Sequence, residues 1–181
     1  HEELMTYILN RFHPRTCLVS SGVIDALDHS SPNPLIGGKL GIDVTGDEIE
    51  CSCHCLDDAL LLEKFSHICH VLAVKTYFTH TSNPITVVQI QKNSAVQDIM
   101  KHVKVWQEVL RIVVFVDEYR NDVNNPYMLI WRVTNNIDAQ RDVMIADQMI
   151  LLDATTKTKE HDNFEREWPR DVECSEHVLH T

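Results

Sequence analysis

The stretch that decides the fold is IVVFVDE at residues 112–118, which is followed by the polar turn NDVNNP at 121–126. Residues 112–116 are apolar at every position, which is typical of a strand buried on both faces of a sheet. YMLIWRVTNNI at 127–137 then predicts an amphipathic helix, and DVMI at 142–145 predicts another strand. A helix between two strands supplies the crossover to a parallel neighbour. The stretch therefore indicates α/β architecture.

The same patterns extend the prediction to the rest of the chain. Helices are expected at 2–12, 57–67 and 95–105, the last capped by Ser94, and strands at 17–20, 71–78, 86–91 and 149–152. Residues 25–48 are expected to form a long loop. Trp131 is assigned to the core, because Leu129, Ile130 and Val133 surround it in the sequence. The whole predicts a mixed, mostly parallel sheet with helices on both faces.

Composition excludes several classes of protein. The 181 residues carry a net charge of −11, which argues against a nucleic-acid partner, since phosphate contacts need clustered lysine and arginine. No apolar run approaches the roughly 20 residues that span a bilayer, so no integral membrane segment is expected. Six cysteines in a chain of this size and apolar content do not require disulfides, which favours a cytoplasmic setting. Because the first predicted helix starts at once after His1, we expect a fragment of a larger protein.

A repeated series of motifs within the chain indicates duplication. Residues 4–12 and 15–19, a helix and an Arg-bearing turn into a strand, parallel residues 127–137 and 141–145. The corner IDVT at 42–45 then matches LDAT at 152–155. The prediction is a single domain, 1–181, with a first repeat unit at about 1–48, a connecting segment at 49–70 and a second unit at about 71–181.

Several motifs in order resemble the C-terminal region of the UbiD family of decarboxylases. In the first unit the resemblance lies in ALDHSSP at 26–32 and GKLGID at 38–43. In the second unit it lies in FVDE (115–118), IWR (130–132), RDV (141–143), DAT (153–155) and EWP (167–169). One departure is that Gly46-Asp47 replaces the lysine expected after the first corner, whereas the second unit keeps Lys157.

The resemblance implies a part of a larger carboxy-lyase. Such enzymes act on aromatic or polyprenyl-hydroxybenzoate acids, as in ubiquinone or menaquinone biosynthesis, using prenylated FMN with a divalent metal and potassium. Their catalytic arginine and two acidic residues lie upstream of this region, so no catalytic residue is assigned here. The matching region packs against the catalytic domain and carries homo-oligomer contacts. The isolated chain is expected to be inactive and to bind no flavin.

Lys92 is the candidate for a cofactor contact. It lies between the predicted strand 86–91 and the helix that follows, where a strand end and a helix N-terminus together favour an anion. The resemblance implies that a lysine in this turn reaches the flavin phosphate of the full-length parent. The alternative is a solvated lysine with no ligand.

The segment CSCHC at 51–55 is the weak candidate for a metal site. Cys51, Cys53 and Cys55 could supply thiolates to zinc, but structural zinc usually takes its ligands from two separated pairs. A second cluster, such as Cys69 with His70, would be required. The alternative is a reduced surface loop, so no metal ligand is assigned.

Other polar groups have structural explanations. Asp28, His29 and Ser30 are adjacent in sequence, which rarely suits a catalytic triad, and Asp28 and Ser30 are expected to brace their loop. Asp117 and Glu118 could act as acid and base or could cap the following turn. Two alternatives to the carboxy-lyase fragment remain open: a stand-alone oligomerisation module, and a small metal-binding protein built on residues 51–55.

Overall fold

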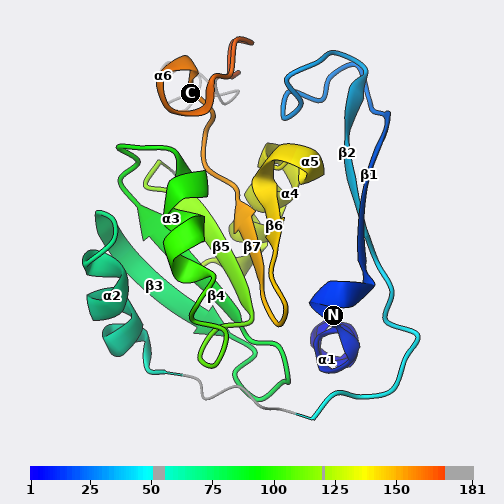
Figure 1. Cartoon of the computed structure of the whole chain (residues 1–181), viewed down its shortest axis with the longest axis vertical. Coiled ribbons are helices and arrows are strands. Elements are labelled where there is room, and N and C mark those ends of the chain that lie inside the picture. Colours follow the sequence, from blue (N-terminus) through cyan, green and yellow to red (C-terminus); the bar gives the residue numbers. More distant parts are fainter. Residues whose placement is uncertain (51–55, 120, 170–181) are drawn as a thin grey trace, which may run out of the picture.

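The computed structural model describes residues 1–50, 56–119 and 121–169. The elements are, in chain order, α1 (Glu2–Arg11), η1 (Pro14–Thr16), β1 (Cys17–Val23), β2 (Ile36–Ile42), α2 (Asp58–Ser66), β3 (Val71–Tyr77), β4 (Ile85–Ile90), α3 (Val96–Val103), β5 (Ile112–Asp117), α4 (Pro126–Asn136), α5 (Ala139–Asp142), β6 (Val143–Ile145), β7 (Ile150–Asp153) and α6 (Lys159–Asp162). They form a five-stranded sheet and a separate two-stranded sheet (Figure 1).

The five-stranded sheet has the order β3-β4-β5-β7-β6. Strands β4, β5 and β7 run parallel to one another, and β3 and β6 are antiparallel at the two edges. This confirms the predicted mixed α/β sheet. The prediction that residues 143–145 form a parallel neighbour of β5 is wrong: β7 takes that place. β6 reaches β7 through a turn of only four residues, which permits an antiparallel pair alone.

Helices cover both faces of this sheet, as predicted. On one face, α2 and α3 pack Phe65 and Met100 against Phe115 of β5. On the other face, α1 and α4 bring Leu9 and Leu129 to a second core cluster. Strand β5 is buried from Ile112 to Val116, because its alternate side chains pack into the two clusters in turn. Burial on both faces explains the continuous apolar run in its sequence.

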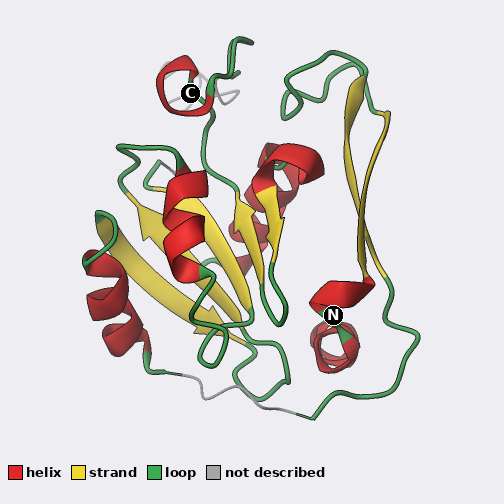
Figure 2. Ribbon diagram, in the orientation of Figure 1, coloured by secondary structure: helices red, strands yellow, loops and turns green. Residues whose placement is uncertain are grey.

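Strands β1 and β2 form an antiparallel hairpin beside the main sheet (Figure 2). The prediction of a loop over 25–48 is therefore wrong for residues 36–42. Three glycines in β2 hid the strand, because glycine lacks the side chain that makes strand patterns readable. Gly38 has a packing reason: a Cβ there would lie 2.4 Å from the backbone nitrogen of Gln140 in α5.

The predicted N-terminal cap is confirmed for α2 but not for α3. Asp57 caps α2 by accepting a hydrogen bond from the N–H of Ala59, in line with the predicted start. The assignment of Ser94 as the cap of α3 is wrong. The N-cap is Ala95, and no side chain in the described part of the chain caps that helix.

The assignment of Trp131 to the core is also wrong, because its side chain lies on the surface. Its exposed fraction is 57%, and Tyr127 and Ile130 are exposed beside it on α4. Residues at spacings of three and four share a helix face, so these three form one stripe. Helix α4 buries the opposite side through Leu129 and Val133. Because the helix carries apolar residues on both sides, a sequence pattern cannot show which side faces the core.

Among the residues described, no helix has both the length and the apolar character needed to cross a bilayer.

Candidate functional site

The carboxyl ends of the three parallel strands meet at one edge of the sheet. Lys92 follows β4, Asp117 ends β5 and Asp153 ends β7. In open α/β sheets, ligands bind outside this edge. It is therefore the candidate functional site, and it brings together the sequence-predicted Lys92 and the second Asp-bearing corner.

Lys92 is buried here by contacts from the chain itself. Its Nζ lies 3.0 Å from Thr155 Oγ1, 2.9 Å from the carbonyl oxygen of Thr156, and 2.9 and 2.7 Å from the two carboxylate oxygens of Asp162. Burial lowers the pKa of Lys92, and Asp153 and Asp162 act against that shift. Asp162 belongs to the four-residue helix α6, so a late segment of the chain covers the lysine.

Lys157 forms the second buried ion pair of this edge. Its Nζ lies 3.0 Å from Asp153 Oδ1 and 3.6 Å from Asp142 Oδ1, and all three side chains are almost wholly inaccessible. It also donates to the carbonyl oxygens of Asp153 and Thr155. A lysine this deep is stable only when paired. Lys157 therefore neutralises the two carboxylates that β7 and α5 bring inside.

The two carboxylates respond differently to this environment. Burial alone would raise the pKa of Asp153, but Lys157, Lys92 and two hydrogen bonds from Thr155 outweigh it and hold the pKa below its ordinary value. For Asp142, burial raises the pKa despite Arg141 and Lys157 nearby. Lys92, Arg141, Asp142, Asp153, Lys157 and Asp162 together form what we call the edge cluster. It contains three cations and three carboxylates, so its charges balance.

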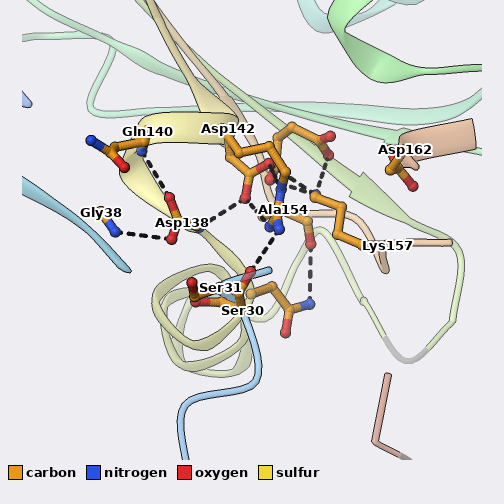
Figure 3. Close-up of polar contacts among 12 residues, drawn as sticks. Ser30, Ser31, Gly38, Asp138, Gln140, Asp142, Ala154, Lys157 and Asp162 are labelled. Atoms are coloured by element: carbon orange, nitrogen blue, oxygen red, sulfur yellow. Dashed lines mark hydrogen bonds and ion pairs between the residues drawn. The ribbon is translucent and has the colours of Figure 1, made fainter. Parts of the chain in front are cut away.

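Arg141 joins the edge cluster to the hairpin side of the molecule. Its guanidinium holds Asp142 at 2.7 and 2.5 Å and donates to the carbonyl oxygen of Ser30 at 2.7 Å. Nearby, Asp138 accepts from the N–H groups of Gln140 and Gly38 (Figure 3). The short helix α5 thus connects the hairpin to the sheet through polar contacts.

The loop before β2 is held by hydrogen bonds within itself and by contacts from residues 166–168. Asp28 Oδ1 accepts from both the N–H and the hydroxyl of Ser30, the bracing expected from the sequence. Arg166 donates to the carbonyl oxygens of Asp28 and Ser31, and Trp168 packs edge-on against His29 with ring centroids 4.7 Å apart. These contacts place no nucleophile against a base. The loop is structural in this arrangement.

Asp117 links two turns. One carboxylate oxygen accepts from the N–H of Thr156 at 2.7 Å, and the other accepts from the side-chain amide of Asn121 at 2.8 Å. Glu118 is exposed. The capping explanation therefore fits Asp117 better than an acid–base role.

The cofactor contact predicted for Lys92 is blocked in this arrangement. The ammonium of Lys92 has three protons, and the three groups Thr155, Thr156 and Asp162 already accept them, so none remains for a flavin phosphate. In the described ranges no three or more His, Cys, Asp or Glu side chains gather as a metal site. Cys51, Cys53 and Cys55, the weak metal candidates, lie outside the described residues.

Cys69, the suggested second metal ligand, is a shielded thiol. Burial raises its pKa to about 11, and its Sγ lies 3.6 Å from the carbonyl oxygen of Phe65. A raised pKa means that the reactive thiolate forms only at higher pH. At pH 8.5 we expect iodoacetamide to modify Cys69 roughly fifty- to a hundredfold more slowly in the folded chain than in urea. Peptide mass spectrometry measures this ratio, and equal rates in the two states would contradict it.

Sequence reasoning found Lys92 and the corner at Asp153 but missed the other members of the cluster. Asp142 gave one signal, since a carboxylate directly before an apolar strand is out of place unless it is paired. Lys157 was noted only as part of a motif. Asp162 lies in a charged segment that reads as solvated, and nothing local distinguishes it from its neighbours.

Comparison with known proteins identifies the domain. Residues 55–164 match the family model described as 3-octaprenyl-4-hydroxybenzoate carboxy-lyase C-terminal domain. Uncharacterized proteins of two Helicobacter pylori strains are 42% identical over 181 residues, which covers 97% of this chain and 29% of theirs. The chain thus spans less than a third of the length of these relatives.

Solved structures of decarboxylases are similar to part of this chain. Vanillic acid decarboxylase of Sedimentibacter hydroxybenzoicus, in its open form with truncated ShVdcD, aligns over 68% of this chain and 31% of its own. The TM-score is 0.51 and the identity is 16%. An evolved dimeric form of the UbiD-class enzyme HmfF from Pelotomaculum thermopropionicum, in complex with prFMN, is 26% identical. That alignment covers 62% of this chain and 26% of that one, with a TM-score of 0.48. Because the family model covers more than half of the residues, the chain belongs to the family of UbiD carboxy-lyase C-terminal domains.

Proposed function

We propose that this chain is a non-catalytic C-terminal region of a UbiD-like carboxy-lyase. The parent would remove the carboxylate of an aromatic or polyprenyl-hydroxybenzoate acid, as in ubiquinone or menaquinone biosynthesis. The chain itself would dock onto the catalytic domain of the same polypeptide and support homo-oligomer formation. The free thiols of Cys17 and Cys69 fit the reducing cytoplasmic setting proposed for the parent.

The observation that carries this proposal is the closed edge cluster. A catalytic site needs charged groups that can reach a substrate, with a pKa tuned to the reaction. At the edge where this fold binds ligands, Lys92 and Lys157 are instead buried against carboxylates of the same chain. This arrangement favours an accessory domain whose charges hold its own segments together.

The exposed stripe of α4 supports docking. Tyr127, Ile130 and Trp131 are 79%, 61% and 57% exposed, and Arg132 is the one charged residue of the helix. On a chain with a net charge of −11, an uncharged apolar helix face is suited to contact with another protein surface. Aromatic side chains of this kind are enriched at interface centres.

For the parent, the proposed cofactor is prenylated FMN with a divalent metal and potassium, held by residues upstream. A phosphate contact from Lys92 remains part of this proposal. Such a contact would require Asp162 to release the ammonium, since the present bonds already use its three protons. Helix α6 is short and close to the end of the described chain, so its displacement is the simplest route.

The activity test compares this chain with a full-length polypeptide. We expect the full-length Helicobacter pylori relative, loaded with prenylated FMN, to release carbon dioxide from an aromatic acid such as a hydroxybenzoate. The 181-residue chain under the same conditions is expected to release none. Carbon dioxide from the purified chain would contradict its non-catalytic role. A cofactor-loaded full-length relative that is inactive on a broad panel of aromatic acids would contradict the proposed parent activity.

A stand-alone interaction module is the second candidate, and the same α4 stripe favours it. In that case the purified chain would self-associate through the stripe. Light scattering that gives a monomer, with Trp131→Lys leaving the mass unchanged, would argue for docking onto a catalytic domain instead.

A further inference from the structure

The two repeat units place a hairpin and a corner in the same geometry. In the first unit Cys17 of β1 pairs with Ile42 of β2, and in the second unit Val143 of β6 pairs with Leu152 of β7. In each case the first residue of the incoming strand lies opposite the residue before the corner aspartate. The two hairpins therefore share one register.

The corners also make the same hydrogen bonds. Asp43 Oδ1 accepts from the N–H of Thr45 at 2.9 Å and from its hydroxyl at 2.7 Å. Asp153 Oδ1 accepts from the N–H and hydroxyl of Thr155 at 3.0 and 2.6 Å. With the register fixed, Leu40 in β2 corresponds to Ile150 in β7.

In the second unit, the side of β7 that faces away from β6 is paired with another strand. The N–H of Ile150 donates to the carbonyl oxygen of Arg111 at 2.8 Å, and the N–H of Ala154 donates to that of Phe115 at 2.9 Å. Strand β5 thus runs parallel to β7 over residues 150–153. Leu151, within the paired stretch, is completely buried in the core cluster on one face of the sheet.

In the first unit, the corresponding edge has no strand beside it among the residues that the structure describes. The N–H of Asp43 donates to the carbonyl oxygen of Thr16, so N–H groups of odd-numbered β2 residues face β1 and those of Leu40, Ile42 and Val44 face away. Within the described residues β1 is the only strand that pairs with β2. We call residues 40–44 the free edge of β2.

The free edge begins where other contacts stop. Further back on the same side of β2, Gly38 donates its N–H to Asp138, and the carbonyl oxygen of Ile36 accepts from the hydroxyl of Ser31. Beyond that point Ile42 is 46% exposed, and Gly41 and Asp43 are exposed as well. An unpaired edge of this kind is a template for strand addition.

We infer that the free edge of β2 accepts a parallel, apolar strand from a second domain of this same fold. The hairpin β1–β2 would close the sheet of that domain as β6–β7 closes the sheet described here. Two observations support this occupant. The family match begins at residue 55, after the first unit, and the Helicobacter pylori relatives carry more than two-thirds of their length outside the matched region. A longer polypeptide of this kind can supply the strand.

Hydrogen exchange tests this inference without any activity readout. The two samples are the full-length Helicobacter pylori relative and its region matching this chain, compared at the amides that correspond to Leu40, Ile42 and Val44. In the full-length protein we expect exchange slowed by roughly a hundredfold or more relative to the region alone. The inner amide of Gly41 serves as the control, because pairing with β1 protects it in both samples.

Two results would overturn the inference. Equal, fast exchange of the free-edge amides in both samples would mean that no strand is added. The other result is slow exchange of these amides in the isolated region, with a rate that increases when the sample is diluted. It would mean that a second copy, not another domain, covers the edge.

A proline pair provides a second measurement. In the full-length protein, Ile42→Pro removes an N–H that faces the added strand, whereas Ser21→Pro removes one on the open outer side of β1. We expect the first variant, and not the second, to lose the protection at Leu40 and Val44. Equal exchange in the two variants would contradict strand addition at β2.

Discussion

Replacing Lys157 with methionine is expected to lower the free energy of unfolding by about 3–5 kcal/mol. The ammonium lies 3.0 Å from Asp153 and 3.6 Å from Asp142, and all three side chains are inaccessible to water. Methionine fills a similar volume but leaves two carboxylates buried with one cation fewer. Urea unfolding monitored by circular dichroism measures the loss.

Lys159 offers the matched control for this substitution. Its pair with Glu165, at 2.9 Å, is exposed on both sides, and exposed pairs contribute about 0–1 kcal/mol. Lys159→Met should therefore change stability little. Adding Asp153→Asn to the Lys157→Met variant should recover part of the loss, because it removes one uncompensated charge. If Lys157→Met costs no more than Lys159→Met, the edge cluster does not stabilise the fold.

Gly38→Ala is expected to destabilise the chain by about 1–3 kcal/mol through overpacking. The added Cβ would lie 2.4 Å from the backbone nitrogen of Gln140 and 2.6 Å from that of Ala139. Since both atoms are backbone, the hairpin must move away from α5, and the hydrogen bond from Gly38 to Asp138 is lost with that movement. Thermal unfolding measures the change.

Gly46 is the control for the alanine substitution. Among the described residues, no atom lies within 4 Å of a Cβ built there, and its φ angle is not positive. Gly46→Ala should therefore be neutral or slightly stabilising. Equal melting temperatures for the two variants would mean that the hairpin does not pack closely against α5.

Local patterns in the sequence predict most of the main sheet. The apolar run of β5 reports burial on both faces, and Asp57 reports the start of α2. Strand β2 was missed because glycines replace the side chains that mark a strand. Trp131 was misplaced because α4 is apolar on two sides, and only the tertiary structure selects which side faces the sheet.

The edge cluster could be predicted only in part, for a physical reason. Lys92 lies at a strand end, a position that the sequence reveals. Its partner Asp162 is 70 residues away, and Lys157 reaches Asp142 across 15 residues. Such pairs depend on how distant segments pack, so a local pattern makes each lysine look solvated. The corner at Asp153 was visible because its bonds to Thr155 are local.

The most direct test of the central claim is a titration of the purified 181-residue chain with FMN, followed by flavin fluorescence. The claim is that the charges at the ligand-binding edge are satisfied within the chain, so that these residues form no cofactor site alone. The expected result is no saturable change in fluorescence at millimolar FMN. Saturable one-to-one binding that Lys92→Met abolishes would contradict the claim.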